Sequence, residues 1–289
     1  MPFAASKGVK LYYEVTGKGR PIIFVHEFAG DYRSWEPQVR YFSRLYRCIT
    51  FNARGYPPSD VPQTPRAYSQ DISTDDVAAV LSHLGVAKAH VVGLSMGGHV
   101  AVNFAIRHPG RARSIVVAGA GFGSVAEKRK QFLALIEKNA RTFEREGAAK
   151  MAKTQGLGPL RIQFRNKDRR GWKEFVAHYS EHSAKGAALT QRGVQMARPS
   201  FYRMERKIRR IRAPALIITG DEDEPCLEPS LFLKRTIPRA GLWIFPKSGH
   251  AINLEEPAWF NEACHAFFAQ VEQGRWDKRD PRARVGSAL

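Results

Sequence analysis

The amino-acid sequence predicts an α/β protein built on a largely parallel β-sheet with helices on both of its faces. Short runs of β-branched and aromatic residues, bounded by glycine and proline, alternate with longer stretches whose apolar residues have helical spacing. This alternation is typical of parallel strands joined by crossover helices. It fails between residues 122 and 210, where no strand-like run occurs. We therefore predict a sheet domain interrupted by a helical segment, called the insertion below and defined as residues 122–210.

The predicted elements follow one another along the chain. Strands are expected at residues 10–15, 21–26, 46–51, 90–92, 114–118, 215–219 and 242–245. Helices are expected at residues 71–84, 96–107 and 256–271 of the sheet domain, and at 126–145 and 172–182 of the insertion. The sheet domain comprises residues 1–121 and 211–272, and the basic residues 273–289 are expected to form a mobile tail.

Composition limits the class of protein. The chain has 289 residues, of which 43% are hydrophobic, and this is enough to bury a sizeable core. No run of about 18 apolar residues occurs, and the N-terminus lacks the pattern of a secretion signal. The three cysteines, Cys48, Cys226 and Cys264, form neither a disulfide framework nor a paired metal motif. We expect a cytoplasmic protein without a membrane span.

The formal charge of +19 is unevenly distributed. Residues 124–210 contain 22 Lys and Arg against 8 Asp and Glu, so most of the excess lies in the insertion. A basic segment can attract anionic substrates, nucleic acid or a membrane surface, although charge runs usually form solvated helical faces. No nucleic-acid-binding motif accompanies the charge, so we expect a small-molecule partner rather than nucleic acid. The sequence carries no signal of oligomeric state.

The sharpest chemical signal is Gly-Leu-Ser-Met-Gly-Gly at residues 93–98, between an expected strand and an expected helix. A sharp strand-to-helix turn holds a serine side chain out at the sheet edge, and small residues two positions away on either side avoid a steric conflict. Gly93 and Gly97 occupy those positions around Ser95. The adjacent helix N-terminus also favours a developing negative charge. We predict that Ser95 is a nucleophile.

A serine nucleophile needs a base, and the base needs an acid that orients it and stabilises its cation. His250 lies in a loop that directly follows the last expected strand, which suits the base. The acid is expected just after the preceding strand, where Asp223 is the first choice, Asp221 the alternative, and Glu222 and Glu224 are less favoured. The resulting chain order is Ser, Asp, His, as in one known class of catalytic triad.

Two backbone N–H groups are expected to form an oxyanion hole. Met96 supplies one because it directly follows the nucleophile. Phe28 supplies the other, in the sequence His-Glu-Phe-Ala-Gly after the second expected strand. The Phe28 side chain is also a candidate for the wall of the acyl pocket.

These residues together resemble the α/β-hydrolase family, and the resemblance extends over residues 9–271. It rests on the turn around Ser95 and on Gly220 with Asp223. It also rests on Ser-Gly-His at residues 248–250, followed by Asn-Leu-Glu-Glu-Pro at residues 253–257, and on the loop at residues 52–59. The resemblance implies an eight-stranded sheet whose second strand is antiparallel. It also implies that the insertion is a helical cap placed after the sixth strand.

The chain departs from the family pattern at two places. Glu27 stands where the family usually has glycine, which puts a carboxylate near the expected oxyanion hole. This carboxylate could face solvent, pair with an arginine of the insertion or repel an acidic substrate, and we favour a structural or entrance role. Asn52 and Pro57 stand where aspartate and glycine are common, which affects the local loop rather than the triad.

The resemblance implies hydrolysis of a small-molecule ester, lactone or similar acyl bond through an acyl-enzyme on Ser95. Carbon–carbon bond hydrolases, perhydrolases and haloperoxidases use the same scaffold and stay open as alternatives, as does a non-catalytic ligand-binding member. Serine argues against epoxide and haloalkane hydrolases, which use aspartate there. The positive insertion hints at an anionic substrate, and no cofactor or metal is expected. The side chains expected to line the substrate pocket are Glu27, Phe122, Trp172, Phe175, Tyr179, Phe201 and Tyr202.

Two rival interpretations depend on the insertion. His178 and His182 belong to an H-x-x-E-H pattern, in which two histidines on one helix face bind zinc. Three fixed positions recur easily by chance, and no third ligand is apparent. The other rival is a basic nucleic-acid binder that uses residues 124–210. We favour the serine hydrolase because its motifs agree over most of the chain.

Overall fold

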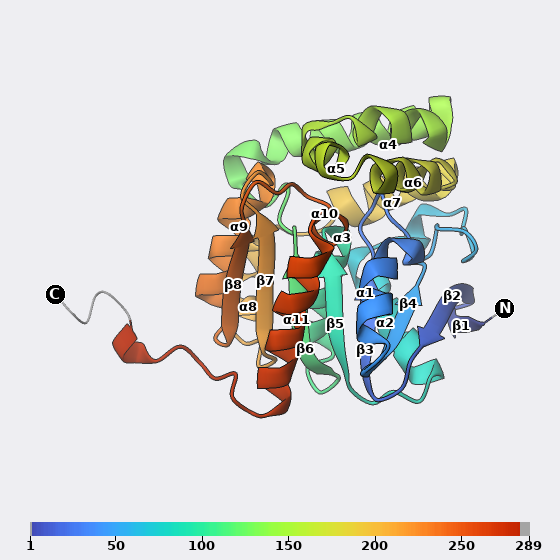
Figure 1. The fold of residues 1–289 in the computed structure, drawn as a ribbon. Coiled ribbons are helices and arrows are strands. Elements are labelled where there is room, and N and C mark those ends of the chain that lie inside the picture. The colour runs from blue at the N-terminus through green and yellow to red at the C-terminus, as the bar shows by residue number, and fades with distance from the viewer. Residues whose placement is uncertain (1, 284–289) are drawn as a thin grey trace.

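The sheet has eight strands in the spatial order β1-β2-β4-β3-β5-β6-β7-β8 (Figure 1). The computed structural model describes residues 2–283. The strands are β1 (Phe3–Ser6), β2 (Val9–Thr16), β3 (Arg20–Val25), β4 (Tyr46–Phe51), β5 (Ala89–Leu94), β6 (Ala112–Ala118), β7 (Ala215–Gly220) and β8 (Ala240–Phe245). β2 is antiparallel to both of its neighbours, and the pairs from β4 to β8 are parallel. The predicted fold class, with its antiparallel second strand, is confirmed.

Helices cover both faces of the sheet. The sheet domain contributes α1 (Glu36–Phe42), α2 (Gln70–His83), α3 (Met96–Arg107), α9 (Glu224–Thr236), α10 (Ile252–Glu255) and α11 (Pro257–Glu272). One apolar cluster joins one face to α2, α3 and α9, through side chains such as Val77, Phe104 and Leu233. A second cluster joins the other face to α1 and α11, through Phe42 and Phe260. Two separate cores therefore hold the strands in a fixed layer between helices.

The N-terminal hairpin differs from the sequence prediction, which places a single strand at residues 10–15. The chain forms β1 and β2 there, and Lys7 and Gly8 connect them with φ angles of 51° and 80°. Positive φ at both central residues is typical of the two-residue turns that match the twist of paired strands. Lys-Gly is a weak turn signal, because lysine seldom takes positive φ.

The insertion is helical, and its helices α4 to α7 lie over the end of the sheet at the top of Figure 1. Its helices are α4 (Ala126–Gly156), α5 (Ile162–Lys167), α6 (Arg169–Ser180), α7 (Ala184–Thr190) and α8 (Glu205–Ile208). α4 is longer than the predicted 126–145, and Gly147 interrupts it with φ of 80° and ψ of 176°. Shorter turns are η1 (Tyr32–Trp35), η2 (Pro65–Ala67), η3 (Pro159–Arg161), η5 (Tyr202–Met204) and η6 (Pro281–Ala283), and η4 (Gln191–Met196) is a π-helical segment.

Trp276 anchors the first part of the C-terminal tail. Trp276 packs on Phe267, with the ring centroids 4.6 Å apart, and its indole N–H donates to the carbonyl of Arg239 at 2.9 Å. Residues 284–289 of the predicted mobile tail lie outside the described residues. Among residues 2–283, no helix combines the length and the apolar character needed to cross a membrane.

Candidate active site

Ser95 lies in a strained turn between β5 and α3. Its φ of 55° and ψ of −108° place a non-glycine residue in a left-handed region of backbone space. A Cβ on Gly93 would come within 2.1 Å of the Gly97 carbonyl, and one on Gly97 within 2.0 Å of the Val25 carbonyl. Both positions therefore require glycine, as the sequence pattern predicts. The turn leaves the Ser95 side chain half-buried rather than enclosed.

His250 and Asp223 form a buried pair at the ends of β8 and β7. The imidazole Nδ1 lies 2.7 Å from Asp223 Oδ2, and the two residues are 4% and 0% exposed. A carboxylate oxygen is only an acceptor, so Nδ1 carries the proton and Nε2 is left as the basic nitrogen. Asp221, the alternative acid, instead accepts the backbone N–H of Ser248 at 3.0 Å. The structure thus pairs His250 with Asp223 and not with Asp221.

The end of β6 lies between this pair and the serine turn. Ser95 N–H donates to the Ala118 carbonyl at 2.8 Å. A Cβ on the next residue, Gly119, would come within 3.3 Å of both Asp223 Oδ2 and the His250 carbonyl. In the described chain the Ser95 hydroxyl makes no hydrogen bond. The carboxylate–imidazole contact is present, and no hydrogen bond joins the Ser95 hydroxyl to His250.

The two predicted oxyanion donors have unused N–H groups. Neither Phe28 N–H nor Met96 N–H donates to an acceptor within residues 2–283. The loop that carries Phe28 is fixed by buried His26, whose Nδ1 lies 2.7 Å from the Glu27 carbonyl and whose Nε2 accepts the N–H of Ala53 at 3.1 Å. Backbone N–H groups that are buried without an acceptor are rare, so this pair is a candidate anion site.

The profile of the alpha/beta hydrolase fold family matches residues 20–257. The chain belongs to this family. The AB hydrolase superfamily protein YisY of Bacillus subtilis is 29% identical over 90% of this chain and 95% of its own. The 3-oxoadipate enol-lactonase 2 of Acinetobacter baylyi is 27% identical over 90% and 94% of the two chains. A thermophilic esterase from Thermogutta terrifontis superposes with a TM-score of 0.82 at 25% identity, covering 93% of this chain and 98% of the esterase.

Within the α/β-hydrolase fold, Glu27 is buried and pairs with the insertion. Its Oε2 accepts a hydrogen bond from Arg161 in η3, and the two side chains are 3% and 7% exposed. The guanidinium of Arg161 also lies 5.3 Å from the centre of the Phe175 ring. Glu27 Oε1 has no hydrogen-bond partner. Of the roles considered for Glu27, pairing with an arginine of the insertion is the one that the structure shows.

The other departure from the family pattern has a local explanation. Asn52 is fully buried, its Oδ1 accepts the N–H of Tyr32 at 2.8 Å, and its Nδ2 donates to the Pro57 carbonyl at 2.7 Å. An aspartate could make the first contact but not the second, because a carboxylate has no hydrogen to donate. Asn52 and Pro57 therefore belong to one loop arrangement.

The predicted pocket residues separate into two groups. Phe175 and Tyr179 are buried in a third apolar cluster, between the insertion and the sheet domain, together with Phe28 and Met96. The ring centroids of Phe28 and Tyr179 are 6.4 Å apart. Trp172 packs at the edge of this cluster, where its indole N–H donates to the Gly156 carbonyl at 2.7 Å.

The remaining predicted pocket residues pack elsewhere. Phe201 stacks on His99 in the core beside α3, with the ring centroids 4.0 Å apart. Tyr202 packs at a tilt against Phe232 of α9, and Phe122 contacts Phe132 of α4. The spacing of these aromatic residues along the sequence is the same for a pocket wall as for a core, so it does not distinguish the two.

Sequence reasoning assigned no role to three residues that contact Phe28 or Glu27. Phe143 lies 5.7 Å from Phe28 between ring centroids, Tyr56 donates its hydroxyl hydrogen to the Phe28 carbonyl at 3.0 Å, and Arg161 holds Glu27. Tyr56 stands in the loop at residues 52–59, so a signal for it existed. Arg161 is one of many arginines in the insertion, and nothing in its spacing marks it.

The structure does not assemble the H-x-x-E-H pattern into one ligand set. His182 is buried against the rings of Tyr56 and Tyr179, and Glu181 pairs with Arg33 at 2.8 Å. Burial lowers the pKa of His182 to about 3. Within residues 2–283, the one group of side chains close enough to share a metal ion is Asp223, Cys226 and His250. Burial raises the pKa of Cys226 well above its usual value, so the thiol stays protonated and donates to the Gly119 carbonyl.

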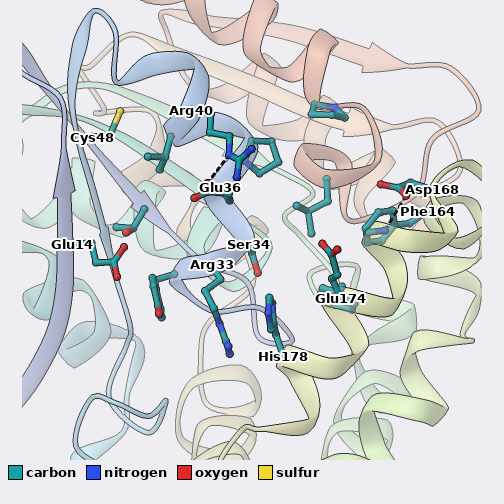
Figure 2. A pocket seen from close by; sticks show the side chains of 18 of the residues that line it. Glu14, Arg33, Ser34, Glu36, Arg40, Cys48, Phe164, Asp168, Glu174 and His178 are labelled. Atoms are coloured by element: carbon teal, nitrogen blue, oxygen red, sulfur yellow. Dashed lines mark hydrogen bonds and ion pairs between the residues drawn. The ribbon is translucent and has the colours of Figure 1, made fainter.

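A separate cleft of about 780 Å³ lies between α6 and the first turns after β3. Figure 2 shows Glu174 and His178 of α6 on one side and Arg33 and Glu36 on the other. None of the triad residues lines it. Phe175 contributes to both the cleft and the cluster around Phe28, so the cleft adjoins the candidate site without containing it.

Proposed function

We propose that the protein hydrolyses a small-molecule ester or lactone through an acyl-enzyme on Ser95. The observation that carries this proposal is the buried Asp223–His250 pair, which packs against Gly119 beside the strained turn of Ser95. A weak nucleophile such as serine is activated by an imidazole that a carboxylate orients, and the proposal assigns these roles to Ser95, His250 and Asp223. The esterase and the enol-lactonase among its relatives support acyl–oxygen bonds as the substrate class.

The mechanism follows from the hydrogen bond between His250 Nδ1 and Asp223, which leaves Nε2 to face the substrate. Nε2 removes the proton of Ser95 as Oγ forms a bond to the acyl carbon, and Asp223 stabilises the imidazolium through Nδ1–H. The oxyanion accepts hydrogen bonds from Phe28 N–H and Met96 N–H. The carbon–oxygen bond then breaks, and the leaving alkoxide takes the proton from Nε2. Water, deprotonated by the same nitrogen, attacks the acyl-enzyme, and Ser95 regains its proton as the acid is released.

The surroundings of Phe28 favour an uncharged acyl group. Arg161 is the cation of the insertion that lies beside this loop, and Glu27 already neutralises it. The other walls are aromatic, with Phe143, Phe175 and Tyr179 at the same cluster. A substrate carboxylate would have to displace Glu27 from Arg161 in a buried site, which costs several kcal/mol. Around Phe28, the charge of the insertion therefore leaves no unpaired Arg161 for a substrate carboxylate.

The decisive experiment is labelling by a fluorophosphonate probe, comparing the wild-type protein with Ser95→Ala. We expect labelling of the wild type alone, and a loss of ester turnover on the order of 10⁴–10⁶-fold in the variant. Equal labelling of both proteins, or of neither, would remove Ser95 from its proposed role.

A substrate panel separates the alternative activities. Matched p-nitrophenyl esters, lactones, a vinylogous diketone and a peracid assay test acyl–oxygen, carbon–carbon and perhydrolase chemistry. Turnover of esters or lactones that depends on Ser95 supports the proposal. Turnover of the diketone alone would indicate a carbon–carbon bond hydrolase, and peracid formation alone would indicate a perhydrolase. Absence of all turnover would favour a ligand-binding member of the fold.

A further inference from the structure

Residues 159–167, which comprise η3 and α5, connect the insertion to the loops that carry the acid and the base. The Leu160 carbonyl accepts the backbone N–H of His250 at 3.2 Å. Gln163 donates to Glu222, which directly precedes Asp223. Lys167, the last residue of α5, reaches the loop before His250. This segment of the insertion therefore contacts His250 itself and the residue that directly precedes Asp223.

Lys167 makes the charged contact of this segment. Its Nζ lies 3.1 Å from Glu255 Oε1, 3.2 Å from Ser248 Oγ, and also binds Glu256. The Glu255 side chain is completely buried, whereas Lys167 is 29% exposed. The two Glu255 oxygens accept the Gly249 N–H at 2.9 and 3.0 Å. Gly249 directly precedes His250, so the contacts run from the insertion through one carboxylate to the base.

The charge of Glu255 depends on its partners. Burial raises the pKa of this carboxyl, and Glu256 raises it further, while the Gly249 N–H and Lys167 act in the opposite direction. A carboxylate accepts hydrogen bonds more strongly than a neutral carboxyl does. Loss of Lys167 would therefore let Glu255 take up a proton at a higher pH and weaken its hold on Gly249.

We propose that Lys167 is a positioning residue for His250, which acts by keeping Glu255 ionised so that Glu255 fixes the backbone of Gly249. The proposal rests on the function proposed above, because it takes His250 as the base. It gives the insertion a role in placing the catalytic imidazole as well as in forming the pocket wall. Small displacements of a base cost rate steeply, on the order of 10²-fold for about 1 Å.

The test measures kcat and KM against pH for wild type, Lys167→Met and Lys167→Arg. Lys167→Met should reduce kcat on the order of 10–10²-fold near pH 6, with little change in KM. Its kcat should recover toward the wild-type value at alkaline pH, where Glu255 ionises without help. Lys167→Arg should behave like wild type. Lys173→Met, an exposed lysine on α6, is the matched control and should also match wild type.

Glu255→Gln distinguishes this route from a direct effect of the lysine charge on His250. Gln cannot ionise, so its kcat should be low at every pH, and adding Lys167→Met to it should cause no further shift. The proposal is wrong if Lys167→Met shifts the profile equally in both backgrounds, lowers kcat by one factor at all pH values, or leaves it unchanged. If Lys167→Met does not fold, Lys167→Gln replaces it in the same cycle. Fluorophosphonate labelling of the wild type and Ser95→Ala reports separately on the proposed function.

Discussion

Asp221 and Asp223 are two residues apart after β7, yet they hold different partners. Asp223 is bonded to the imidazole of His250, whereas Asp221 accepts the backbone N–H of Ser248. Both contacts help to place the loop that ends at His250, but only the first determines which imidazole nitrogen is protonated. The sequence alone ranks the two aspartates and cannot separate their roles, because both follow the same strand.

Asp223→Asn should lower kcat for an ester on the order of 10⁴-fold, because the amide presents the wrong tautomer of His250 to Ser95. Asp221→Asn is the matched control, since its side-chain oxygen still accepts from Ser248. We expect it to lose less than about tenfold, or about 1.4 kcal/mol of transition-state stabilisation. Steady-state kinetics with one ester measure both variants. Equal losses would show that the two aspartates act only on the loop.

Arg161→Met should destabilise the protein by about 3–5 kcal/mol, because it leaves the buried Glu27 carboxylate without a charged partner. Urea unfolding measures the change. The double variant Glu27→Leu/Arg161→Met should recover most of the loss, since two apolar side chains of similar size often replace a buried ion pair without cost. A double variant as unstable as Arg161→Met would mean that the arginine acts through packing on Phe175.

At the scale of elements, the sheet domain could be predicted because its signals are local. α3 spans the predicted residues 96–107, and β4 spans the predicted residues 46–51. The triad assignment follows from order along the chain and stays a prediction that kinetics must test. The contacts of the insertion could not be predicted, because Arg161 with Glu27 and Lys167 with Glu255 are long-range pairs that leave no periodic pattern.

Gly97→Ala tests how tightly α3 approaches β3. The new Cβ would lie 2.0 Å from the Val25 carbonyl and 2.9 Å from the His26 carbonyl, and neither backbone atom can move alone. We expect a loss of about 3 kcal/mol or more, with reduced fluorophosphonate labelling. Gly110→Ala is the control, because no atom lies within 4 Å of its Cβ position. Its stability should stay within about 0.5 kcal/mol of wild type. Similar unfolding midpoints for both variants would contradict the close approach.

At the scale of the whole molecule, several histidines are buried in an uncharged state. Burial lowers the pKa of His26, of His99 and of His182, the last to about 3. On unfolding, each would take up a proton below its ordinary pKa of about 6.5. The unfolded state therefore binds more protons than the folded state in acid, which favours unfolding.

The free energy of unfolding should fall as the pH drops from about 6.5, by up to about 1.4 kcal/mol per pH unit for each such histidine. Above a pH of about 6.5 these histidines do not make the free energy of unfolding depend on pH. Urea midpoints at pH 7.5, 6.5, 5.5 and 4.5 measure the effect, and His182→Phe should make the decline less steep. A midpoint that is constant from pH 6.5 to 4.5 would show that these imidazoles are not held neutral by the fold.

The docking of residues 159–167 on the loops around Asp223 and His250 has a consequence for chimeric proteins. Suppose that the insertion is replaced by that of a relative, with the exchange points after β6 and before β7. A foreign segment would then lie against Glu255 and the His250 backbone. Crossover points at the limits of the insertion would thus separate residues 159–167 from the residues that they contact. A productive recombinant should inherit residues 159–167 and 247–256 from the same parent.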